Sequence, residues 1–337
     1  MNLDKKLEQN GIFPDEELKV DKKIEIAKFV AQGLCDNFKE FADMYNEFYM
    51  RIYNCKFYYA QIDSKFNGVF YYYKNNAIYI SKDKQIDEYL VHEVIHYIQN
   101  FSKVQGNEKK AGLCEFEDYR ILALGINEAM VQYITSKIMG EEVLRRNFGS
   151  MSIMTNSPDR YKFLASLAYQ ITYFIDEEQA VKSSLKSDSV FTEKLYNTYE
   201  DQTEKILKKF DEILEENNKP QLNNEKVSQI YLEVQEILYT VYFNKMIKYV
   251  ATTKEIDEQV EKIENYENII GKNLNNDKYF NNFLEFKSKM ETRFLKEYVE
   301  MSRKQSKRNL PVTYKNVFQR IFDKIARIFK GKKVENK

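Results

Sequence analysis

The sequence predicts an α+β protein that is mostly helical, in which a unit with a small antiparallel sheet precedes a helical bundle. Gly and Pro are scarce, at ten and four of 337 residues, which favours long helices over a turn-rich β fold. Short segments rich in Tyr, Phe, Ile and Val occur between residues 57 and 81. Beyond about residue 176 the pattern is that of charged amphipathic helices.

The overall composition argues against a strongly charged partner. Lys plus Arg equals Asp plus Glu, at 52 each, so no net charge favours nucleic acid or an acidic polymer. Cys35, Cys55 and Cys114 form no Cys-x-x-Cys pair, which indicates free thiols in a reducing compartment. The start of the chain is charged rather than apolar, and no run of about 18 apolar residues occurs. We therefore expect a cytoplasmic protein with no signal peptide or transmembrane segment.

The N-terminal part is expected to hold one long helix and then the sheet. Residues 1–20 are typical of a loosely held lead-in. Apolar residues at three- and four-residue steps predict an amphipathic helix over residues 21–53, packed across the back of the sheet. Residues 57–63, 69–73 and 77–81 have strand composition and are separated by turn formers. They predict a three-stranded antiparallel meander.

The next predicted helix, residues 84–102 with a cap within residues 81–83, carries the candidate chemistry. His92 and His96 are the only two histidines, and their spacing of four stacks both imidazoles on one helix face, where they can bind one zinc ion. Two randomly placed histidines would fall four apart in about one chain in 170. Glu93 follows the first histidine and can reach a water molecule held by that metal.

A zinc ion at this motif needs a third protein ligand, because catalytic sites use three protein groups and one water. With no further histidine and no paired cysteines, that ligand is an Asp or Glu oxygen. Glu128 begins an apolar helix predicted over residues 127–140, where an unpaired carboxylate is costly, so we choose it. The helix dipole alone also favours a carboxylate there. The other nearby carboxylates lie in a polar cluster: Glu115, Glu117 and Asp118.

These two motifs resemble a known family. Residues 90–96 (Leu-Val-His-Glu-Val-Ile-His), followed by residues 125–129 (Gly-Ile-Asn-Glu-Ala), resemble the two zinc-binding helices of gluzincin metallopeptidases of the thermolysin-like branch. The resemblance covers about residues 56–140. It implies a zincin-like catalytic unit with one Zn²⁺ per chain, held by His92, His96 and Glu128, and Glu93 as general base. The implied function is hydrolysis of peptide bonds by metal-activated water.

The chain departs from the family pattern in two ways. Thirty-one residues, 97–127, separate the histidine motif from Glu128, which is longer than in thermolysin. Where thermolysin relatives carry an Asp that supports a zinc histidine, this chain has Gln132. Gln132 can accept a hydrogen bond from an imidazole but adds no negative charge. The alternative supporting groups are the three carboxylates of the polar cluster at residues 115–118.

Two further parts of a peptidase site have candidates. The segment of residues 76–81 is the candidate edge strand along which an extended substrate could pair, although an ordinary β–α connection explains it equally well. The negative charge that develops on the substrate oxygen needs a donor, and both histidines are used as ligands. Tyr or Arg must therefore serve, and the candidates are Tyr161, Arg160, Tyr169 and Tyr133.

The rest of the chain is predicted to be helical. An apolar helix over residues 161–174 completes the catalytic unit, and no catalytic cluster follows it. The expected domains are residues 1–180, a helical domain of residues 181–312, and a tail of residues 313–337. Further helices are predicted over residues 191–216, 225–251, 254–270 and 279–306.

The tail contains a basic amphipathic helix, Val317–Lys333. Such a helix can lie on an anionic membrane or dock into a partner protein, or it can pack on its own core. The leading function is thus a zinc-dependent metallopeptidase acting on a peptide or protein substrate. The alternatives are a non-catalytic scaffold or membrane-binding module with a structural or vestigial zinc site, and a metal hydrolase of a non-protein amide. Glu93 favours catalysis, because a structural zinc needs no base.

Overall fold

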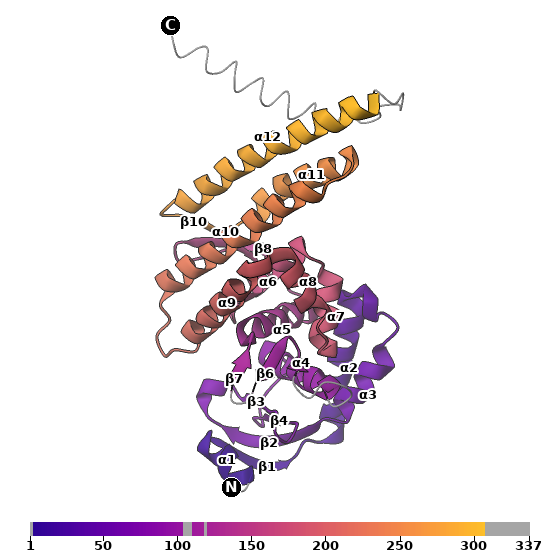
Figure 1. Cartoon of the computed structure of the whole chain (residues 1–337). Coiled ribbons are helices and arrows are strands. Elements are labelled where there is room, and N and C mark those ends of the chain that lie inside the picture. The colour runs from indigo at the N-terminus through magenta and orange to yellow at the C-terminus, as the bar shows by residue number, and fades with distance from the viewer. Residues whose placement is uncertain (1–2, 104–109, 118–119, 307–337) are drawn as a thin grey trace. The chain divides into compact units, whose positions relative to one another are not determined.

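The structure is a computed structural model that describes residues 3–103, 110–117 and 120–306. The chain is α+β and mostly helical, with small sheets, which confirms the predicted class (Figure 1). It divides into two compact units, the first made of residues 1–146 and 154–231 and the second of residues 147–153 and 232–337. This division differs from the expected boundary after residue 180, because helices beyond that point pack into the first unit.

The main sheet of the first unit has the strand order β1 (Ile12–Glu17), β2 (Lys56–Ile62), β4 (Ala77–Ile80) and β3 (Val69–Tyr72). Strand β2 runs parallel to β4, whereas β3 is antiparallel to β4. The three expected strands therefore exist, but the antiparallel meander is wrong. Every residue of β4 is buried, and a strand buried on both faces belongs in the interior of a sheet. Strand β3 lies at the edge instead.

The first 20 residues are not a loose lead-in. Helix α1 (Leu3–Gln9) leads into β1, which pairs antiparallel with β2. Leu7 and Ile12 are buried with Tyr79 of the central strand. The prediction failed because only the first residue of β1 is buried and the other residues are exposed, so the strand has no alternating apolar pattern.

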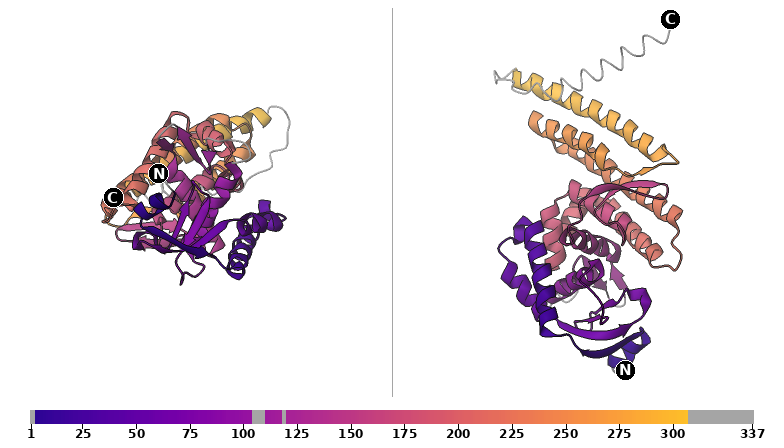
Figure 2. Two further views of the ribbon diagram at one scale, coloured as in Figure 1. Left: turned by 90° about the horizontal axis from the view of Figure 1, so that it is seen from below. Right: turned by 180° about the vertical axis from the view of Figure 1, so that it is seen from behind.

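The long helix predicted over residues 21–53 is broken. Helix α2 (Val20–Asn37) ends at Phe38, which has extended backbone with φ of −131°, and a short 3-10 turn (η1, Lys39–Phe41) leads into α3 (Tyr45–Tyr53). Figures 1 and 2 show α2 and α3 folded back side by side. Phe41 packs edge-on against Phe48 with ring centroids 5.3 Å apart. The apolar residues that suggested one continuous helix therefore pack two helices against each other in a helical hairpin.

Helix α4 (Glu88–Lys103) contacts β3 and β4 on one side and α5 (Leu124–Ile138) on the other (Figure 1). It begins four residues later than predicted, where the Asp87 side chain accepts a hydrogen bond from the Leu90 N–H at 3.1 Å. Helix α5 was predicted over residues 127–140; it begins at Leu124 and ends at Ile138, and Gly140, with φ of +80°, follows its last turn. A small sheet of β5 (Lys110–Ala111), β6 (Cys114–Glu117) and β7 (Arg120–Leu122) connects the two helices.

Shorter helices complete the first unit. Helix α6 (Lys162–Phe174) confirms the predicted apolar helix, and α7 (Glu177–Lys186) was not expected. The single helix predicted over residues 191–216 is two, α8 (Val190–Tyr199) and α9 (Thr203–Asn217), joined by the turn η3 (Glu200–Gln202).

The helices that follow confirm the prediction to within two residues. They are α10 (Asn224–Tyr249), which begins in the first unit, α11 (Thr253–Ile269) and α12 (Lys278–Ser306). In the second unit Tyr239, Tyr266 and Phe283 pack together at ring-centroid distances of 5.2–6.1 Å. The unpredicted strands are β8 (Leu144–Phe148), β9 (Met151–Thr155) and β10 (Lys272–Asn273), which form one sheet in the order β10-β9-β8.

The predicted basic helix Val317–Lys333 lies outside the described residues. Among the helices that the structure describes, none combines the length and the hydrophobicity needed to span a lipid bilayer.

Candidate metal centre

Two neighbouring helices bring the predicted metal ligands together. His92 and His96 lie one turn apart on α4, and Glu128 lies in the second turn of α5, which packs alongside. The Nε2 atoms of the two histidines are 3.1 Å apart. Each of them is also 3.1 Å from a different carboxylate oxygen of Glu128.

This donor set suits a zinc ion. Ligands of a tetrahedral zinc at 2.0–2.1 Å bond length are separated by about 3.3 Å. The two Nε2 atoms are 3.1 Å apart, which is close to that separation, and each lies 3.1 Å from the oxygen of Glu128 that faces it. With one ligand atom taken from each residue, the three atoms lie within 4.8 Å of one another. Two imidazole nitrogens and one carboxylate oxygen are also a usual set for a catalytic zinc with an open position. His92, His96 and Glu128 thus form a group that could hold a metal ion.

The electrostatics of the three side chains match their proximity. Burial lowers the pKa of His92 to about 3, and the positive charge of Arg160 adds to this effect. Burial also opposes charge on His96, but the carboxylate of Glu128 raises its pKa overall. Burial would raise the pKa of Glu128, yet the nearby charge of His96 holds it well below its usual value. The negative charge of Glu128 thus stabilises positive charge on His96.

Glu93 lies beside this group and pairs with Arg160. The guanidinium Nη2 of Arg160 is 3.6 Å from Oε1 of Glu93, and both side chains are 17% exposed. Burial raises the pKa of Glu93, while the charge of Arg160 opposes that rise. Arg160 itself is sandwiched between Tyr89 and Tyr161, with its Cζ atom 5.2 and 5.0 Å from the two ring centroids.

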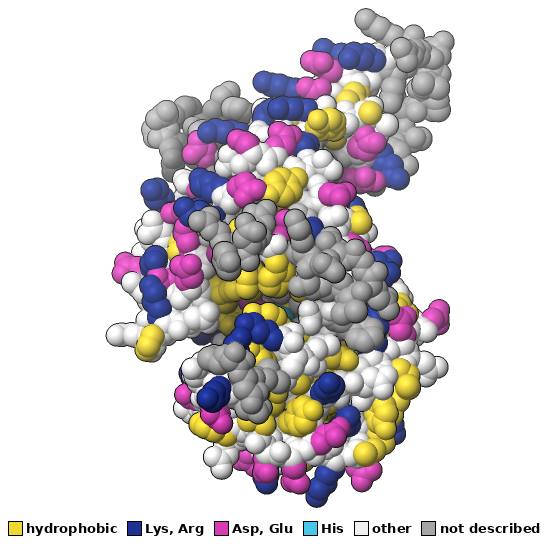
Figure 3. All heavy atoms as spheres, turned by 60° about the horizontal axis from the view of Figure 1, so that its bottom comes forward, with side chains coloured by type: hydrophobic (Ala, Val, Ile, Leu, Met, Phe, Trp, Pro, Cys, Tyr) yellow, Lys and Arg dark blue, Asp and Glu magenta, His cyan; other side chains and the backbone are white. Residues whose placement is uncertain are grey.

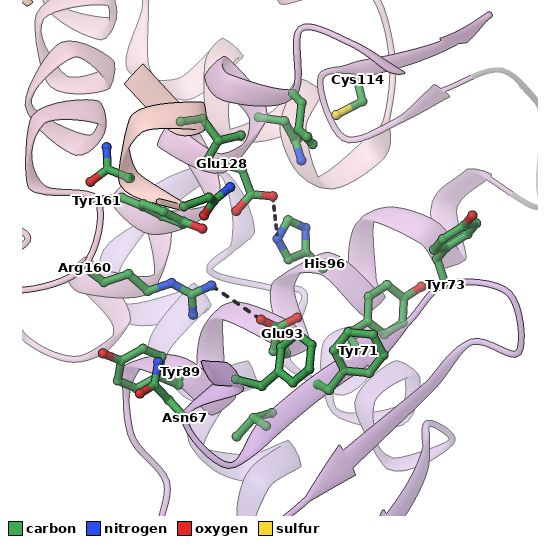
Figure 4. Close-up of a pocket in the computed structure, with 18 of the residues that line it drawn as sticks. Asn67, Tyr71, Tyr73, Tyr89, Glu93, His96, Cys114, Glu128, Arg160 and Tyr161 are labelled. Carbon is green, nitrogen blue, oxygen red and sulfur yellow. Dashed lines mark ion pairs between the residues drawn. The ribbon is translucent and has the colours of Figure 1, made fainter. Parts of the chain in front are cut away.

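A cavity of about 990 Å³ gives access to these side chains. Figure 3 shows hydrophobic side chains gathered around a hollow on this face of the molecule. Figure 4 shows Glu93, His96 and Glu128 directed into the cavity, with Arg160 and Tyr161 on one side. Its opposite walls carry apolar side chains from the 3-10 turn Ser64–Phe66, from β3 and from the β6–β7 sheet, among them Phe66, Phe70, Phe116 and Ile121.

The structure separates the four candidates for an oxyanion donor. Arg160 and Tyr161 line the cavity. Tyr161 is 5.9 Å from His92 between ring centroids and has a left-handed backbone with φ of 48°, which is strained for a tyrosine. Tyr133 instead donates a hydrogen bond to Glu177 at 2.7 Å and stacks on Tyr169, and neither residue lines the cavity.

The strand beside the site is not the one predicted. Residues 76–81, the candidate edge strand, contain β4, which lies between β2 and β3 in the sheet. The edge is β3, and its residues Val69, Phe70 and Tyr71 line the same cavity as Glu93. The prediction of the edge strand was wrong because it assumed an antiparallel meander, in which the last strand lies at the edge of the sheet.

Of the other carboxylates named from the sequence, the described one, Glu115, does not join the metal group. Glu115 pairs with Lys110 at 2.6 Å, and neither lines the cavity. The Glu117 side chain and Asp118 lie outside the described residues.

Glutamines support both histidines. The side chain of Gln132 lies 3.0 Å from Nδ1 of His92, as the sequence allowed. Gln99, three residues after His96, lies 3.2 Å from Nδ1 of that histidine. Gln99 lies one turn after His96 on the same helix face, and this spacing could have identified it from the sequence as a hydrogen-bond partner of His96.

Comparisons with known proteins add no identification. No protein-family model, no curated protein and no solved structure matches the chain.

Proposed function

We propose that this protein is a zinc-dependent metallopeptidase with a gluzincin-type, zincin-like site that hydrolyses peptide bonds. The observation that carries the proposal is the convergence of His92, His96 and Glu128, whose ligand atoms lie within 4.8 Å of one another, on a cavity that also holds the carboxylate of Glu93. A zinc ion bound there supplies Lewis acidity, which lowers the pKa of a water molecule and polarises a carbonyl group.

Glu93 is the proposed general base. Its carboxylate lies in the cavity next to His96 (Figure 4). There it would take a proton from the attacking water molecule and pass it to the leaving amine. The partly buried ion pair with Arg160 holds the carboxylate in one position and favours its ionised form, which is the form a base needs.

Tyr161 is the proposed donor to the developing oxyanion. Its side chain reaches the cavity beside Glu128, whereas Arg160 extends toward Glu93 (Figure 4). Because burial raises the pKa of Tyr161 to about 12, the hydroxyl keeps its proton at neutral pH and can donate it in a hydrogen bond. A donor fixed in a site shielded from water stabilises charge that develops during the reaction.

Strand β3 is the proposed substrate-binding edge. The Ser81 N–H donates to the Gly68 carbonyl at 2.9 Å, and Val69 faces Ile80 in the antiparallel ladder. Hydrogen-bonded pairs alternate in such a ladder, so the backbone groups of Val69 and Tyr71 point to the outer edge. An extended peptide can pair with these groups beside the metal centre. This edge and the large cavity favour a peptide over a small amide as substrate.

The proposal is tested by metal analysis of the purified protein together with cleavage of a degenerate peptide library by wild type and Glu93→Gln. We expect one zinc per chain in both proteins and cleavage by wild type only. Zinc without cleavage of any peptide would favour the non-catalytic module, and absence of zinc would refute the site.

We also propose a reducing, cytoplasmic location. Cys35, Cys55 and Cys114 are all free thiols, and burial raises the pKa of Cys55 and Cys114 well above the usual value, so both remain protonated.

A further inference from the structure

We propose that Gln132 and Gln99 are positioning residues that fix both metal-binding histidines with a hydrogen on Nδ1 and a free lone pair on Nε2. The inference rests on the proposed metal site and concerns how that site is preorganised. It is based on two buried chains of hydrogen bonds, one through each glutamine. In each chain, a neighbouring group that can only donate or only accept a hydrogen bond determines which way the side-chain amide points.

The orientation of Gln132 follows from Ser157. The Ser157 hydroxyl donates to the backbone carbonyl of Arg160, so its oxygen is left to accept from Gln132 Nε2, 3.0 Å away. The carboxylate of Glu88, which accepts when ionised, lies 3.3 Å from the same Nε2 atom. The oxygen of Gln132 must then face His92 Nδ1, at 3.0 Å. Because an amide oxygen only accepts, Nδ1 of His92 carries the hydrogen.

The orientation of Gln99 follows from a backbone N–H. The N–H of Leu113 donates to Oδ1 of Asn127 at 2.8 Å, which fixes the asparagine amide. Nε2 of Gln99 lies 3.0 Å from the same oxygen and donates to it. Its own oxygen therefore faces Nδ1 of His96 at 3.2 Å. This nitrogen must also carry a hydrogen, so both imidazoles present Nε2 to Glu128.

A glycine shows that the second chain is built into the fold. Gly112, in the turn between β5 and β6, has φ of +63°, and a Cβ atom there would lie 2.1 Å from Asn127 Oδ1 and 2.5 Å from Gln99 Nε2. The hydroxyl of Ser187 accepts from the Gly112 N–H at 2.7 Å and donates to the Gln99 carbonyl at 2.8 Å. No larger residue fits against these amides.

The consequence is a metal site whose histidines are oriented by neutral groups. A carboxylate in the same place would orient the ring and also raise its basicity, whereas an amide supplies orientation alone. Loss of either glutamine should therefore weaken metal binding through misorientation, although neither touches the metal position. Removal of such a supporting group typically lowers metal affinity by about 10–100-fold.

The test is zinc affinity of the full chain, measured by competition with a chromophoric chelator, for wild type, Gln132→Met and Gln99→Met. We expect each variant to bind zinc about 10–100-fold more weakly. Gln132→Glu, which keeps an oxygen facing Nδ1, should restore affinity to at least the wild-type level. The matched control is Gln170→Met, which removes a buried amide that donates to Tyr231 at 2.6 Å, away from the site. It should bind zinc as wild type does.

A second measurement reads the tautomers directly. Since the chain has two histidines, the ¹⁵N spectrum of zinc-loaded wild type should show two imidazoles, both protonated on Nδ1. A hydrogen on Nε2 of either ring, or unchanged zinc affinity in both methionine variants, would overturn the inference and leave the metal site standing. Failure of wild type to bind zinc would overturn both. Circular dichroism of the zinc-free variants shows whether they fold.

Discussion

Glu93 is the residue on which the proposed catalysis depends most directly. Glu93→Gln keeps the shape of the side chain and removes its ability to take a proton, so we expect kcat to fall by about 10²–10⁴-fold. Zinc content should remain at wild-type level, because Glu93 is not among the three converging ligands. The measurement is kcat on a cleaved peptide with zinc determined in the same sample, and loss of zinc together with activity would contradict the assigned role.

Tyr161 offers a second test at the scale of one hydroxyl. Tyr161→Phe should lower kcat by about 10²–10³-fold with little change in KM, because the donor acts on charge that develops only in the transition state. Tyr169→Phe is the matched control, since Tyr169 does not line the cavity. Steady-state kinetics of both variants decide the point, and equal activity of Tyr161→Phe and wild type would transfer the role to Arg160.

At the scale of elements, Gly125 determines how closely α5 approaches α9. A Cβ atom at Gly125 would lie 2.3 Å from the backbone carbonyl of Phe210, which cannot move aside without shifting α9. We expect Gly125→Ala to lower the free energy of unfolding by about 1–3 kcal/mol. Gly33→Ala in α2 is the comparison, because its new methyl meets side-chain atoms of Ile138 and no backbone atom. Urea denaturation of both variants should show the smaller loss in Gly33→Ala.

Helix α7 depends on a capping carboxylate. The side chain of Asp176 accepts from the Gln179 N–H at 3.1 Å and from Lys194 Nζ at 3.2 Å. Burial alone would raise the pKa of Asp176, but these hydrogen bonds lower it below the unfolded value of 3.8. Its stabilising effect is therefore present above the unfolded pKa and is lost as the pH falls through the folded pKa.

We accordingly expect Asp176→Ala to lower the free energy of unfolding by about 1 kcal/mol at pH 7. The difference from wild type should shrink as the pH falls from 3.8 through the lower folded pKa, because Asp176 of the folded wild type becomes protonated over that range. Asp176→Asn keeps the acceptor without the charge and should lose less. Guanidinium denaturation across this pH range makes the comparison, and a loss that grows at low pH would contradict the assignment.

At the scale of the whole molecule, metal binding should be linked to folding. The candidate ligands join α4 to α5, and these two helices contact the sheet, α6, α7 and α9 of the first unit. Zinc should thus stabilise the folded protein by about 2.7 kcal/mol when free zinc is about 100 times Kd. Thermal unfolding with zinc and with a chelator measures this shift. Glu128→Gln should show a much smaller shift, and an equal one would refute Glu128 as a ligand.

The sequence by itself determined the local chemistry and the helices. A spacing of four on one helix is a local quantity, so His92 and His96 could be placed on one face before any fold was known. The cost of burying an unpaired carboxylate pointed to Glu128, which the structure places against both imidazoles. The α10, α11 and α12 helices followed from periodicity, which needs no distant contact.

Tertiary structure alone decided what depends on residues distant in sequence. The placement of β4 between β2 and β3 depends on which strands pair, and strand composition is the same for a parallel and an antiparallel neighbour. Charged β1 became a strand because it pairs with β2, not because of its own pattern. The orientation of the histidine rings depends on Ser157 and Leu113, which lie 65 and 17 residues from the histidines they help to orient. Hydrogen bonds across such separations exist only after the chain has folded. The sequence therefore specifies which residues are the candidate metal ligands, and the fold specifies how their side chains are oriented.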